Sequence, residues 1–244
     1  MMTPTTQNKT TYTKAESWKI FDAIYLRYDL LNTILSMGYH KNWRDKILAM
    51  APQRSNLKVL DLATGTADVL ITLTKNNTNI VQGIGIDLSE NMLKLGREKI
   101  KNLNLGNKIS LQKGDATQLS FLNDEFDFAT MSFGIRNVEN PILTLKEIYR
   151  VLKTDGRAVI LEFSLPSNIV MKIFYLLYLK IFVPTVGGLI SGDFKAYFYL
   201  NRTIEKFPYG EMFNRMMRQC GFKNVTATPL LFGVATIYCA EKTL

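Results

Sequence analysis

Five short apolar runs, separated by polar stretches with helical spacing, constrain the fold more than any other feature of the sequence. They are Val59-Leu60, Ile84–Ile86, Ile109–Leu111, Phe126–Met131 and Ala158–Phe163. Strands that alternate with helices build βαβ units, in which the strands pair in parallel. Two further β-rich runs near the end of the chain are joined by a loop that contains Pro229 and Gly233: Val225–Thr228 and Ala235–Cys239. The pattern predicts an α/β fold with a mostly parallel sheet and a C-terminal antiparallel hairpin.

The segment before the first run has the spacing of helices with one apolar face. Apolar residues recur there at Ile20, Ile24, Leu31 and Leu35. No linker rich in Gly, Ser or Pro marks a boundary further along, and 244 residues suffice for one continuous α/β core. We therefore expect a single domain with an N-terminal helical flap (1–56), a core (57–165), an apolar insertion (166–206) and a C-terminal helix and hairpin (207–244).

The most apolar stretch of the chain is Asn168–Ile190. A membrane-spanning helix needs about 20 mainly apolar residues. This stretch carries Lys172 and Lys180 and meets Pro184 and the Gly187-Gly188 pair, and proline interrupts helices. We expect an interfacial or pocket-lining helix rather than a membrane span, with packing in the core or a dimer contact as the alternatives.

The charge balance bears on the partners of the chain. Lys and Arg number 30 against 21 Asp and Glu, a formal net charge of +9. The excess is spread out and no basic run is interleaved with aromatic residues, so we expect no nucleic-acid partner and favour an anionic membrane surface. The two cysteines form no CxxC pair and His40 is the single histidine, which leaves no metal cluster. Residues 1–11 are polar, without a secretory signal, so we expect a cytoplasmic protein associated peripherally with a membrane.

The first apolar run leads directly into a loop of small residues, Val59-Leu-Asp-Leu-Ala-Thr-Gly-Thr-Ala-Asp68. Backbone N–H groups in such a loop can approach a ligand closely, because Ala63, Gly65 and Ala67 carry no bulky side chain. The fingerprint GxGxxG is absent, which disfavours NAD and FAD. The loop suits adenosine joined to methionine, although a tight connection without a ligand explains this segment equally well by itself.

Carboxylates follow the second and third apolar runs. Asp87 ends the second run, 22 positions after Gly65, and can accept hydrogen bonds from both hydroxyls of a ribose. Asp115 follows the third run and can accept from an adenine amino group, while the small Ala116 leaves room for the ring. A helix cap for Asp87 and a turn residue for Asp115 are the alternatives, but Ser89 already suits the cap. Together the three strand ends predict a nucleoside site.

The order of these motifs resembles class I S-adenosylmethionine methyltransferases, and more closely the quinone C-methyltransferase family that makes menaquinol and ubiquinol. The resemblance extends from Tyr28 to Tyr238. Its specific segments are Tyr28–His40 with Trp43, Ser132-Phe-Gly-Ile-Arg-Asn-Val138, Glu162-Phe-Ser-Leu-Pro166, Tyr197–Leu200 and Phe207-Pro208. The resemblance implies a Rossmann-like, doubly wound, mostly parallel sheet of seven strands.

In that family the methyl donor is held by residues that match Thr66, Asp87, Asp115, Ala116 and Ser132 here, and Gly65 belongs to the same loop. The chain departs from the family pattern at Ala67, where glycine usually follows the threonine, which puts the affinity in doubt but not the chemistry. Methyl transfer from a sulfonium is an in-line displacement that depends on positioning. We therefore expect S-adenosylmethionine as the donor, S-adenosylhomocysteine as the product and no metal.

The acceptor that the resemblance implies is a ring carbon of a polyprenylated quinol, which becomes reactive when a neighbouring hydroxyl loses its proton. We expect Arg136 and Asn137 to stabilise the negative charge that develops on the quinol oxygen. A surface ion pair is the alternative for Arg136, which is too basic to act as a general base. His40 is a candidate proton acceptor if the flap folds over the pocket, and a packed structural histidine is its alternative.

Demethylmenaquinol is the acceptor we expect, with 2-polyprenyl-6-methoxy-1,4-benzoquinol of ubiquinone biosynthesis or another small apolar molecule as alternatives. The hydrocarbon tail requires an apolar groove or work at the bilayer face, and a homodimer is a further option. The insertion suits both a groove for the tail and contact with the bilayer, because its apolar side chains Phe174, Tyr175, Tyr178 and Phe182 are accompanied by lysines that can face lipid head groups. A nicotinamide-dependent oxidoreductase and a non-catalytic quinone carrier are the rival classes.

Overall fold

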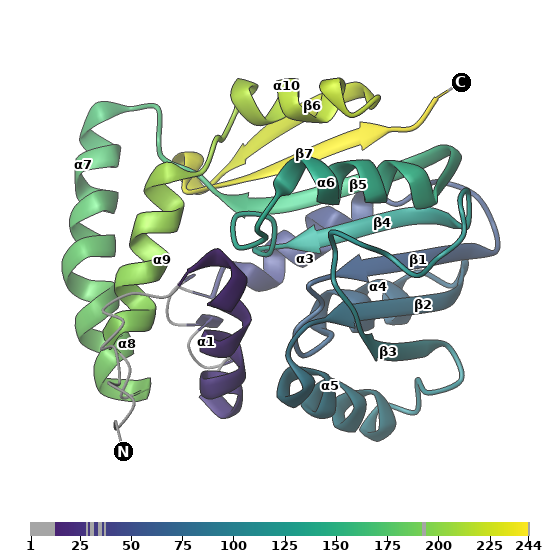
Figure 1. Cartoon of the computed structure of the whole chain (residues 1–244), viewed down its shortest axis with the longest axis horizontal. Helices are drawn as coiled ribbons and strands as arrows, with labels where there is room; N and C mark the ends of the chain where they lie inside the picture. The colour runs from purple at the N-terminus through teal and green to yellow at the C-terminus, as the bar shows by residue number, and fades with distance from the viewer. Residues whose placement is uncertain are drawn as a thin grey trace, which may run out of the picture.

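One seven-stranded sheet organises the molecule (Figure 1). The computed structural model describes residues 13–27, 29, 32–33, 36, 38–191 and 194–243. Leu31 and Leu35, which contributed to the prediction of the flap, lie outside the described residues. The strands lie in the order β3-β2-β1-β4-β5-β7-β6. Their bounds are β1 Leu57–Leu62, β2 Ile80–Asp87, β3 Ile109–Lys113, β4 Phe126–Ser132, β5 Leu152–Phe163, β6 Lys223–Leu230 and β7 Ala235–Glu241.

The pairing of the strands confirms the predicted architecture. The strands β1 to β5 pair in parallel, and β7 runs antiparallel to β5 and β6. The chain order reverses at β1, between β2 and β4, and open α/β sheets bind ligands outside the carboxyl ends of the strands at such a switch point. One detail was wrong: Pro229 lies within β6, opposite Thr236, and the turn is Leu231–Gly233. Proline is tolerated there because β6 is an edge strand.

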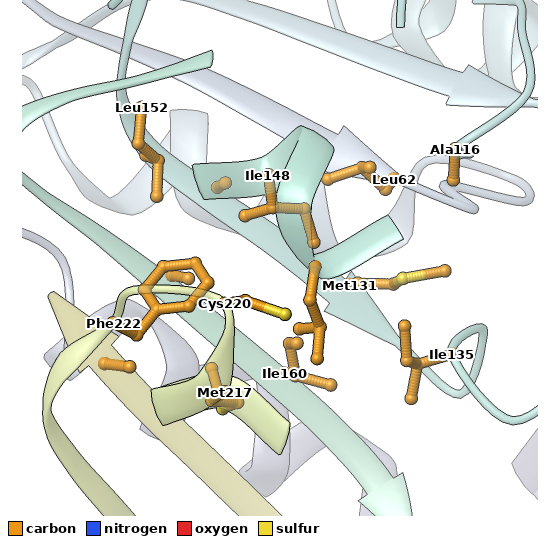
Figure 2. Packing of buried hydrophobic residues seen from close by; sticks show 14 of the residues in the cluster. Leu62, Ala116, Met131, Ile135, Ile148, Leu152, Ile160, Met217, Cys220 and Phe222 are labelled. Atoms are coloured by element: carbon orange, nitrogen blue, oxygen red, sulfur yellow. The ribbon is translucent and has the colours of Figure 1, made fainter. Parts of the chain in front are cut away.

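Apolar cores cover both faces of the sheet. On one face, α6 (Pro141–Val151) and α10 (Glu211–Gln219) pack against the strands, and Figure 2 shows Met217 and Phe222 beside Ile148 and Ile160. On the other face lie α3 (His40–Ala49), α4 (Asp68–Asn76) and α5 (Glu90–Asn102). Helices on both faces make the sheet doubly wound, as predicted.

Side-chain caps begin two of the helices that follow strands of the parallel sheet, α5 and α6. Ser89 caps α5, with its hydroxyl oxygen accepting the backbone N–H of Met92 at 3.2 Å. Asn140 caps α6 in the same way, and Pro141 occupies the first helical position, where its fixed φ suits the helix. The cap of α5 is therefore Ser89, which leaves the Asp87 carboxylate for another role.

The flap and the insertion pack together at the carboxyl edge of the parallel strands (Figure 1). Before α3, the described flap contains η1 (Lys14–Glu16), α1 (Ser17–Ile24) and η2 (Tyr25–Arg27). The insertion contains α7 (Ile169–Leu177), η3 (Tyr178–Phe182), α8 (Val183–Ser191) and α9 (Phe194–Lys206). Ile20 of α1 joins Tyr175, Leu179, Tyr197 and Ile204 of the insertion in a third apolar core. This third core covers the ends of the strands.

The insertion begins with one continuous helical run, Ile169–Leu189, which by length and composition alone could cross a membrane. Only 22% of its most apolar window is buried. We expected Pro184 and the Gly187-Gly188 pair to interrupt the stretch, and this was wrong, because α8 continues through both. The π-helical turn η3 directly precedes α8. Such a turn changes the backbone hydrogen-bond pattern beside Pro184, which has no N–H to donate. Gly187 is required for packing, since a Cβ there would lie 2.3 Å from the ring of Tyr197.

Candidate functional site

A cavity at the carboxyl edge of the sheet collects most of the residues predicted to bind the methyl donor. It is lined by Gly65, Asp87, Asp115, Ala116 and Ser132, which follow or end four neighbouring strands. Residues of the flap close it from outside, among them Lys14, Ser17 and Trp18. We call it the nucleoside cavity. Of the six predicted residues, only Thr66 is missing from its lining.

A second cavity adjoins the first and contains all three predicted catalytic residues. His40, Arg136 and Asn137 line it together, although His40 is distant in the sequence from the other two. We call it the acceptor cavity. Its wall is otherwise mainly aromatic and aliphatic, with Ile20, Ile24, Phe163, Leu161 and Leu200. The two cavities share the lining residues Phe21, Ala63, Ser132, Phe133 and Asn137, so they meet at these residues.

The loop between β1 and α4 adopts a conformation that small residues favour. Ala63, Gly65 and Ala67 all have positive φ, at 50°, 55° and 65°. This left-handed conformation costs an alanine roughly 1 kcal/mol relative to glycine. At Ala67 the cost falls where the family pattern usually has glycine. The backbone thereby turns the N–H of Gly65 toward the end of β2, where it donates to Asp87 Oδ2 at 2.9 Å.

The Asp87 carboxylate is held in place by backbone donors. Besides Gly65, the N–H of Ser89 donates to its Oδ1 at 2.9 Å. Burial raises the pKa of Asp87, and the backbone N–H groups of Ser89, Gly65 and Leu88 oppose the rise. A carboxylate can accept about four hydrogen bonds, so these donors leave part of its capacity for a ligand hydroxyl.

The other lining residues of the nucleoside cavity differ in their surroundings. Asp115 is exposed and its Oδ1 accepts both the N–H and the hydroxyl of Thr117 at 2.8 Å. The turn described by the alternative is therefore present, beside a carboxylate that also lines the cavity. Ala116 is buried next to it. Ser132 ends β4, and its buried hydroxyl has no hydrogen-bond partner among the described residues. Buried hydroxyls normally have a partner, which points to a ligand at this position.

Thr66 lies on the acceptor side of the loop, and its hydroxyl is engaged by charged residues. It donates to Asp29 of the flap at 3.0 Å and accepts from Lys99 of α5 at 2.9 Å. Lys99 also contacts Asp29 and Asp68 at 2.5 and 2.8 Å, and Asp68 pairs with Arg44 at 2.9 Å. We call Asp29, Arg44, Thr66, Asp68 and Lys99 the flap clasp. It joins the flap, the loop and three helices at one point.

A second contact fastens α1 to the start of α5. The carboxylate of Asp22 accepts from the Ser89 hydroxyl at 2.6 Å and from the Asn91 side chain at 3.0 Å. Ser89 is also the residue whose N–H binds Asp87. The flap is therefore connected through one serine to the carboxylate predicted to hold the ribose.

Arg136 is buried in the wall of the acceptor cavity rather than in a surface ion pair. Its NH1 donates to Glu162 Oε1 at 2.6 Å and to the backbone oxygen of Phe133 at 2.8 Å, and its backbone N–H donates to Glu162 Oε2 at 3.2 Å. The guanidinium lies 5.2 Å from the centre of the Phe163 ring. Burial raises the pKa of Glu162, and the charge of Arg136 opposes the rise. The buried Nε of Arg136 has no hydrogen-bond partner among the described residues.

Asn137 and His40 are the other two predicted catalytic residues in the acceptor cavity. Asn137 donates from Nδ2 to the backbone oxygen of Phe133 at 3.2 Å, and no described residue bonds to its buried Oδ1. His40 is the first residue of α3, and its Nδ1 lies 2.7 Å from the hydroxyl of Ser36. Burial lowers the pKa of His40. The flap therefore does bring His40 to the pocket, as its candidate role requires.

Comparison with known proteins identifies the chain. Its residues 7–242 match the ubiE/COQ5 methyltransferase family. The chain belongs to that family. A demethylmenaquinone methyltransferase of Bacteroides fragilis is 43% identical over 92% of this chain and 91% of its own length. A ubiquinone/menaquinone biosynthesis C-methyltransferase UbiE of Geotalea daltonii is 40% identical over 92% of this chain and 95% of its own length.

A solved structure supports the fold independently. The structure of a SAM-dependent methyltransferase from Thermotoga maritima matches with a TM-score of 0.64 at 18% identity, over 93% of this chain and 100% of that one. At this identity the likeness concerns the fold alone. Together with membership of the ubiE/COQ5 methyltransferase family, it confirms the prediction of a class I, S-adenosylmethionine-dependent C-methyltransferase. Among the described residues, no group of three or more His, Cys, Asp and Glu side chains could hold a metal ion.

Several residues of this family member's site were not predicted. Glu162 was noted only as part of a motif, although its position beside Arg136 makes it central to the acceptor cavity. Asp61 also lines this cavity, buried in β1, where it accepts from the hydroxyls of Thr64 and Thr130, both at 2.6 Å. A carboxylate inside an apolar strand was the available signal in both cases. The contacts of Asp29 with Lys99, 70 residues apart, gave no sequence signal.

Proposed function

We propose that this family member transfers the methyl group of S-adenosylmethionine to a ring carbon of a polyprenylated quinol, with demethylmenaquinol as the acceptor. The observation that carries the proposal is the junction of the two cavities at Ala63, Ser132, Phe133 and Asn137. A donor in the nucleoside cavity and a ring in the acceptor cavity would meet there, and such positioning supplies most of the acceleration in a displacement. The relative of Bacteroides fragilis carries the name of this activity.

The nucleoside cavity offers the donor a matching set of groups. Asp87 is held for the two ribose hydroxyls, and Asp115 beside the small Ala116 suits the adenine ring. The buried Ser132 hydroxyl lacks a partner within the described part of the chain, so it is available to the methionine part of the donor. Gly65 contributes backbone, and we assign Thr66 to the wall between donor and acceptor. When bound, S-adenosylmethionine supplies an electrophilic methyl group on a sulfonium.

The acceptor cavity provides for the charge that the reaction develops. We propose that His40 takes the proton of a quinol hydroxyl, and that Arg136 and Asn137 stabilise the resulting phenolate. The unpaired Nε of Arg136 is a donor for such an oxygen. Glu162 orients the guanidinium and is itself held by two backbone N–H groups. The ring hydroxyls then face this polar end while the tail lies against the aromatic and aliphatic wall.

A methyl-transfer assay with matched acceptors tests the proposal. Purified protein, labelled S-adenosylmethionine and demethylmenaquinol should give labelled menaquinol. Arg136→Met should lower kcat about 10² to 10³-fold, as loss of one oxyanion donor does, with donor binding retained in calorimetry. Arg202→Met, a basic residue outside the lining of both cavities, serves as the control. The proposal fails if the folded protein binds the donor and methylates no quinol.

The relatives named for ubiquinone as well as menaquinone biosynthesis favour a second acceptor, a polyprenylated 6-methoxybenzoquinol. The same polar end would hold its hydroxyls, because both rings carry two oxygens para to each other. A benzoquinol is smaller than a naphthoquinol by one fused ring. Competition between the two acceptors in one reaction mixture gives the ratio of their kcat/KM values directly.

We also propose that the protein is cytoplasmic and meets its substrate at a membrane surface through α7. Its apolar side chains Ile169, Val170, Ile173, Phe174 and Leu177 are between 50% and 67% exposed. The net charge of +9 attracts anionic head groups. Lys172 lies on the same helix, and α7 packs through Tyr175 on the third core that borders the acceptor cavity.

Sedimentation with vesicles of anionic phospholipid tests the membrane contact. Ile173→Ser with Phe174→Ser should reduce binding at least tenfold, since each exposed side chain contributes on the order of 1 kcal/mol on burial in the bilayer. Leu122→Ser removes an apolar side chain that is 78% exposed elsewhere and should bind as before. Sedimentation velocity without lipid distinguishes a homodimer, in which the same double substitution would instead release monomers.

A further inference from the structure

A short chain of hydrogen bonds in the flap ends at His40. The Ser36 hydroxyl donates to the backbone oxygen of Asn32 at 2.6 Å. Nδ1 of His40 lies 2.7 Å from the same Ser36 oxygen. A serine hydroxyl has one proton to donate, and Asn32 receives it. The ring of His40 must therefore be the donor in the second bond, which places a proton on Nδ1.

We propose that Ser36 is a positioning residue for methyl transfer: it holds His40 in the Nδ1–H tautomer, so that Nε2 is the proton acceptor for the quinol hydroxyl. The inference rests on the proposed function and adds to it both the atom and the residue that orients it. His40 lines the acceptor cavity, and no hydrogen bond reaches Nε2 from the described residues. Neutral histidine in water prefers the proton on Nε2, so the protein must impose the other form.

Burial favours the neutral ring of His40, and the charges around the ring act in both directions. Lys41 and Arg44 on its own helix disfavour a second proton, whereas Asp68 of α4 and Asp29 of the flap favour one. Arg44 and Asp68 pair with each other at 2.9 Å, so their effects largely cancel. Burial is the largest influence and lowers the pKa of the ring below its ordinary value of 6.5. At neutral pH the imidazole is therefore unprotonated on Nε2 and able to accept.

The reaction balances with this assignment. The O–H bond of the quinol breaks, its proton moves to Nε2, and the oxygen electron pair shifts into the ring. The ring carbon forms a bond to the methyl group as the carbon–sulfur bond breaks, and that electron pair stays on sulfur as a thioether. The methylated ring then loses its C–H proton to water, and the oxygen regains a proton from Nε2. One proton is released overall, in place of the sulfonium charge.

The tautomer can be read directly, because His40 is the single histidine of the chain. Nitrogen-15 NMR of the ring, in the protein without substrate, should show Nδ1 protonated and Nε2 unprotonated. In Ser36→Ala the ring should return toward the Nε2–H form. Thr33→Ala is the matched control, since the Thr33 hydroxyl also donates to the backbone oxygen four residues earlier, at 2.8 Å, but does not contact His40. Its spectrum should equal that of the wild type.

Turnover should follow the tautomer. His40→Ala should lower kcat with demethylmenaquinol about 10² to 10⁴-fold, the usual contribution of a general base, and remove the acid limb of the pH–rate profile. Added imidazole should restore part of that rate. Ser36→Ala should lower kcat about fivefold, the equivalent of one neutral hydrogen bond, with donor affinity unchanged and the acid limb moved.

The outcomes separate this inference from the proposed function. An Nε2–H ring in the wild type overturns it, as does a Ser36→Ala ring that keeps the wild-type tautomer. An acid limb that persists in His40→Ala removes His40 from the proton transfer. If the NMR result is as expected and the wild type methylates no quinol, the positioning by Ser36 stands as a structural fact and the proposed substrate is wrong.

Discussion

Asp61 gives the sharpest quantitative test of the structure. It lies within β1, 1% exposed, and accepts hydrogen bonds from the hydroxyls of Thr64 and Thr130. Both partners are neutral. Burial raises the pKa of Asp61 from 3.8 to about 6, and these two hydroxyls only partly oppose it. The charged form is thus less favourable in the folded protein than in the unfolded chain.

The sign and size of the effect on stability follow from linkage. Between pH 3.8 and 6 the folded state holds a proton on Asp61 that the unfolded state has lost. The contribution of this proton to stability is present below pH 3.8 and is lost as the pH rises through 6. Each pH unit of difference corresponds to about 1.4 kcal/mol, so the total loss is roughly 3 kcal/mol. About 1 kcal/mol is lost by pH 4.5 and the remainder, about 2 kcal/mol, by pH 7.5.

Urea unfolding of the wild type and of Asp61→Asn at pH 4.5 and 7.5 measures this loss of stability. The variant cannot titrate at residue 61, so the free energy of unfolding of the wild type minus that of the variant should fall by about 2 kcal/mol between the two pH values. Other carboxylates cancel in the difference. Glu241→Gln is a control for which the same difference should rise with pH, because hydrogen bonds from Asn224 and Arg157 lower the pKa of Glu241. A difference for Asp61→Asn that is equal at both pH values would refute the reasoning.

Three further predictions concern the two cavities. Asp87→Asn should weaken binding of S-adenosylmethionine about 10²-fold in calorimetry, because two hydrogen bonds to a charged group become weaker or are lost. Glu162→Gln should lower the free energy of unfolding by about 3 to 5 kcal/mol in urea, because it leaves the buried charge of Arg136 unpaired; adding Arg136→Met should recover stability but not turnover. Asp22→Asn, which weakens the contact of α1 with Ser89, should raise the Kd for the donor severalfold and leave the unfolding midpoint within about 2 °C.

The sheet could be predicted because its signals are local. The central parallel strands β1 and β4 are buried on both faces and show as mainly apolar runs, as in Phe126–Met131. The hairpin followed from β-rich runs of the right length. The insertion was harder, because proline normally interrupts a helix, whereas here a π-helical turn precedes Pro184 and the helical run continues through it. Such a turn has no composition of its own, so the sequence does not reveal it.

The site divides in the same way. Asp87, Asp115 and Ser132 lie at strand ends, and parallel strands bring their carboxyl ends to one edge, so their meeting could be predicted. Thr66 is assigned to the donor by resemblance, and this role stays a prediction; its contacts with Asp29 and Lys99 could not be predicted. That arrangement depends on how the flap docks. Docking of the flap is set by contacts between residues far apart in the chain, and the periodicity of the sequence does not predict such contacts.

The flap explains why the two cavities should act together. Asp29 of the flap clasp, Asn32 and Ser36 of the hydrogen-bond chain, and His40 all lie in one segment of twelve residues. The segment is fixed at one end by the clasp on Thr66 and Lys99 and continues at the other into α3, whose Trp43 is buried against the sheet. A donor that orders the loop at Gly65 and Thr66 should therefore also order His40, the proposed acceptor of the quinol proton. Demethylmenaquinol should consequently bind more tightly to the protein with S-adenosylhomocysteine present than without it, and by linkage the product should gain the same factor from the quinol. Lys99→Met, which removes the cation of the clasp, should abolish this coupling in calorimetric titrations while each ligand still binds alone.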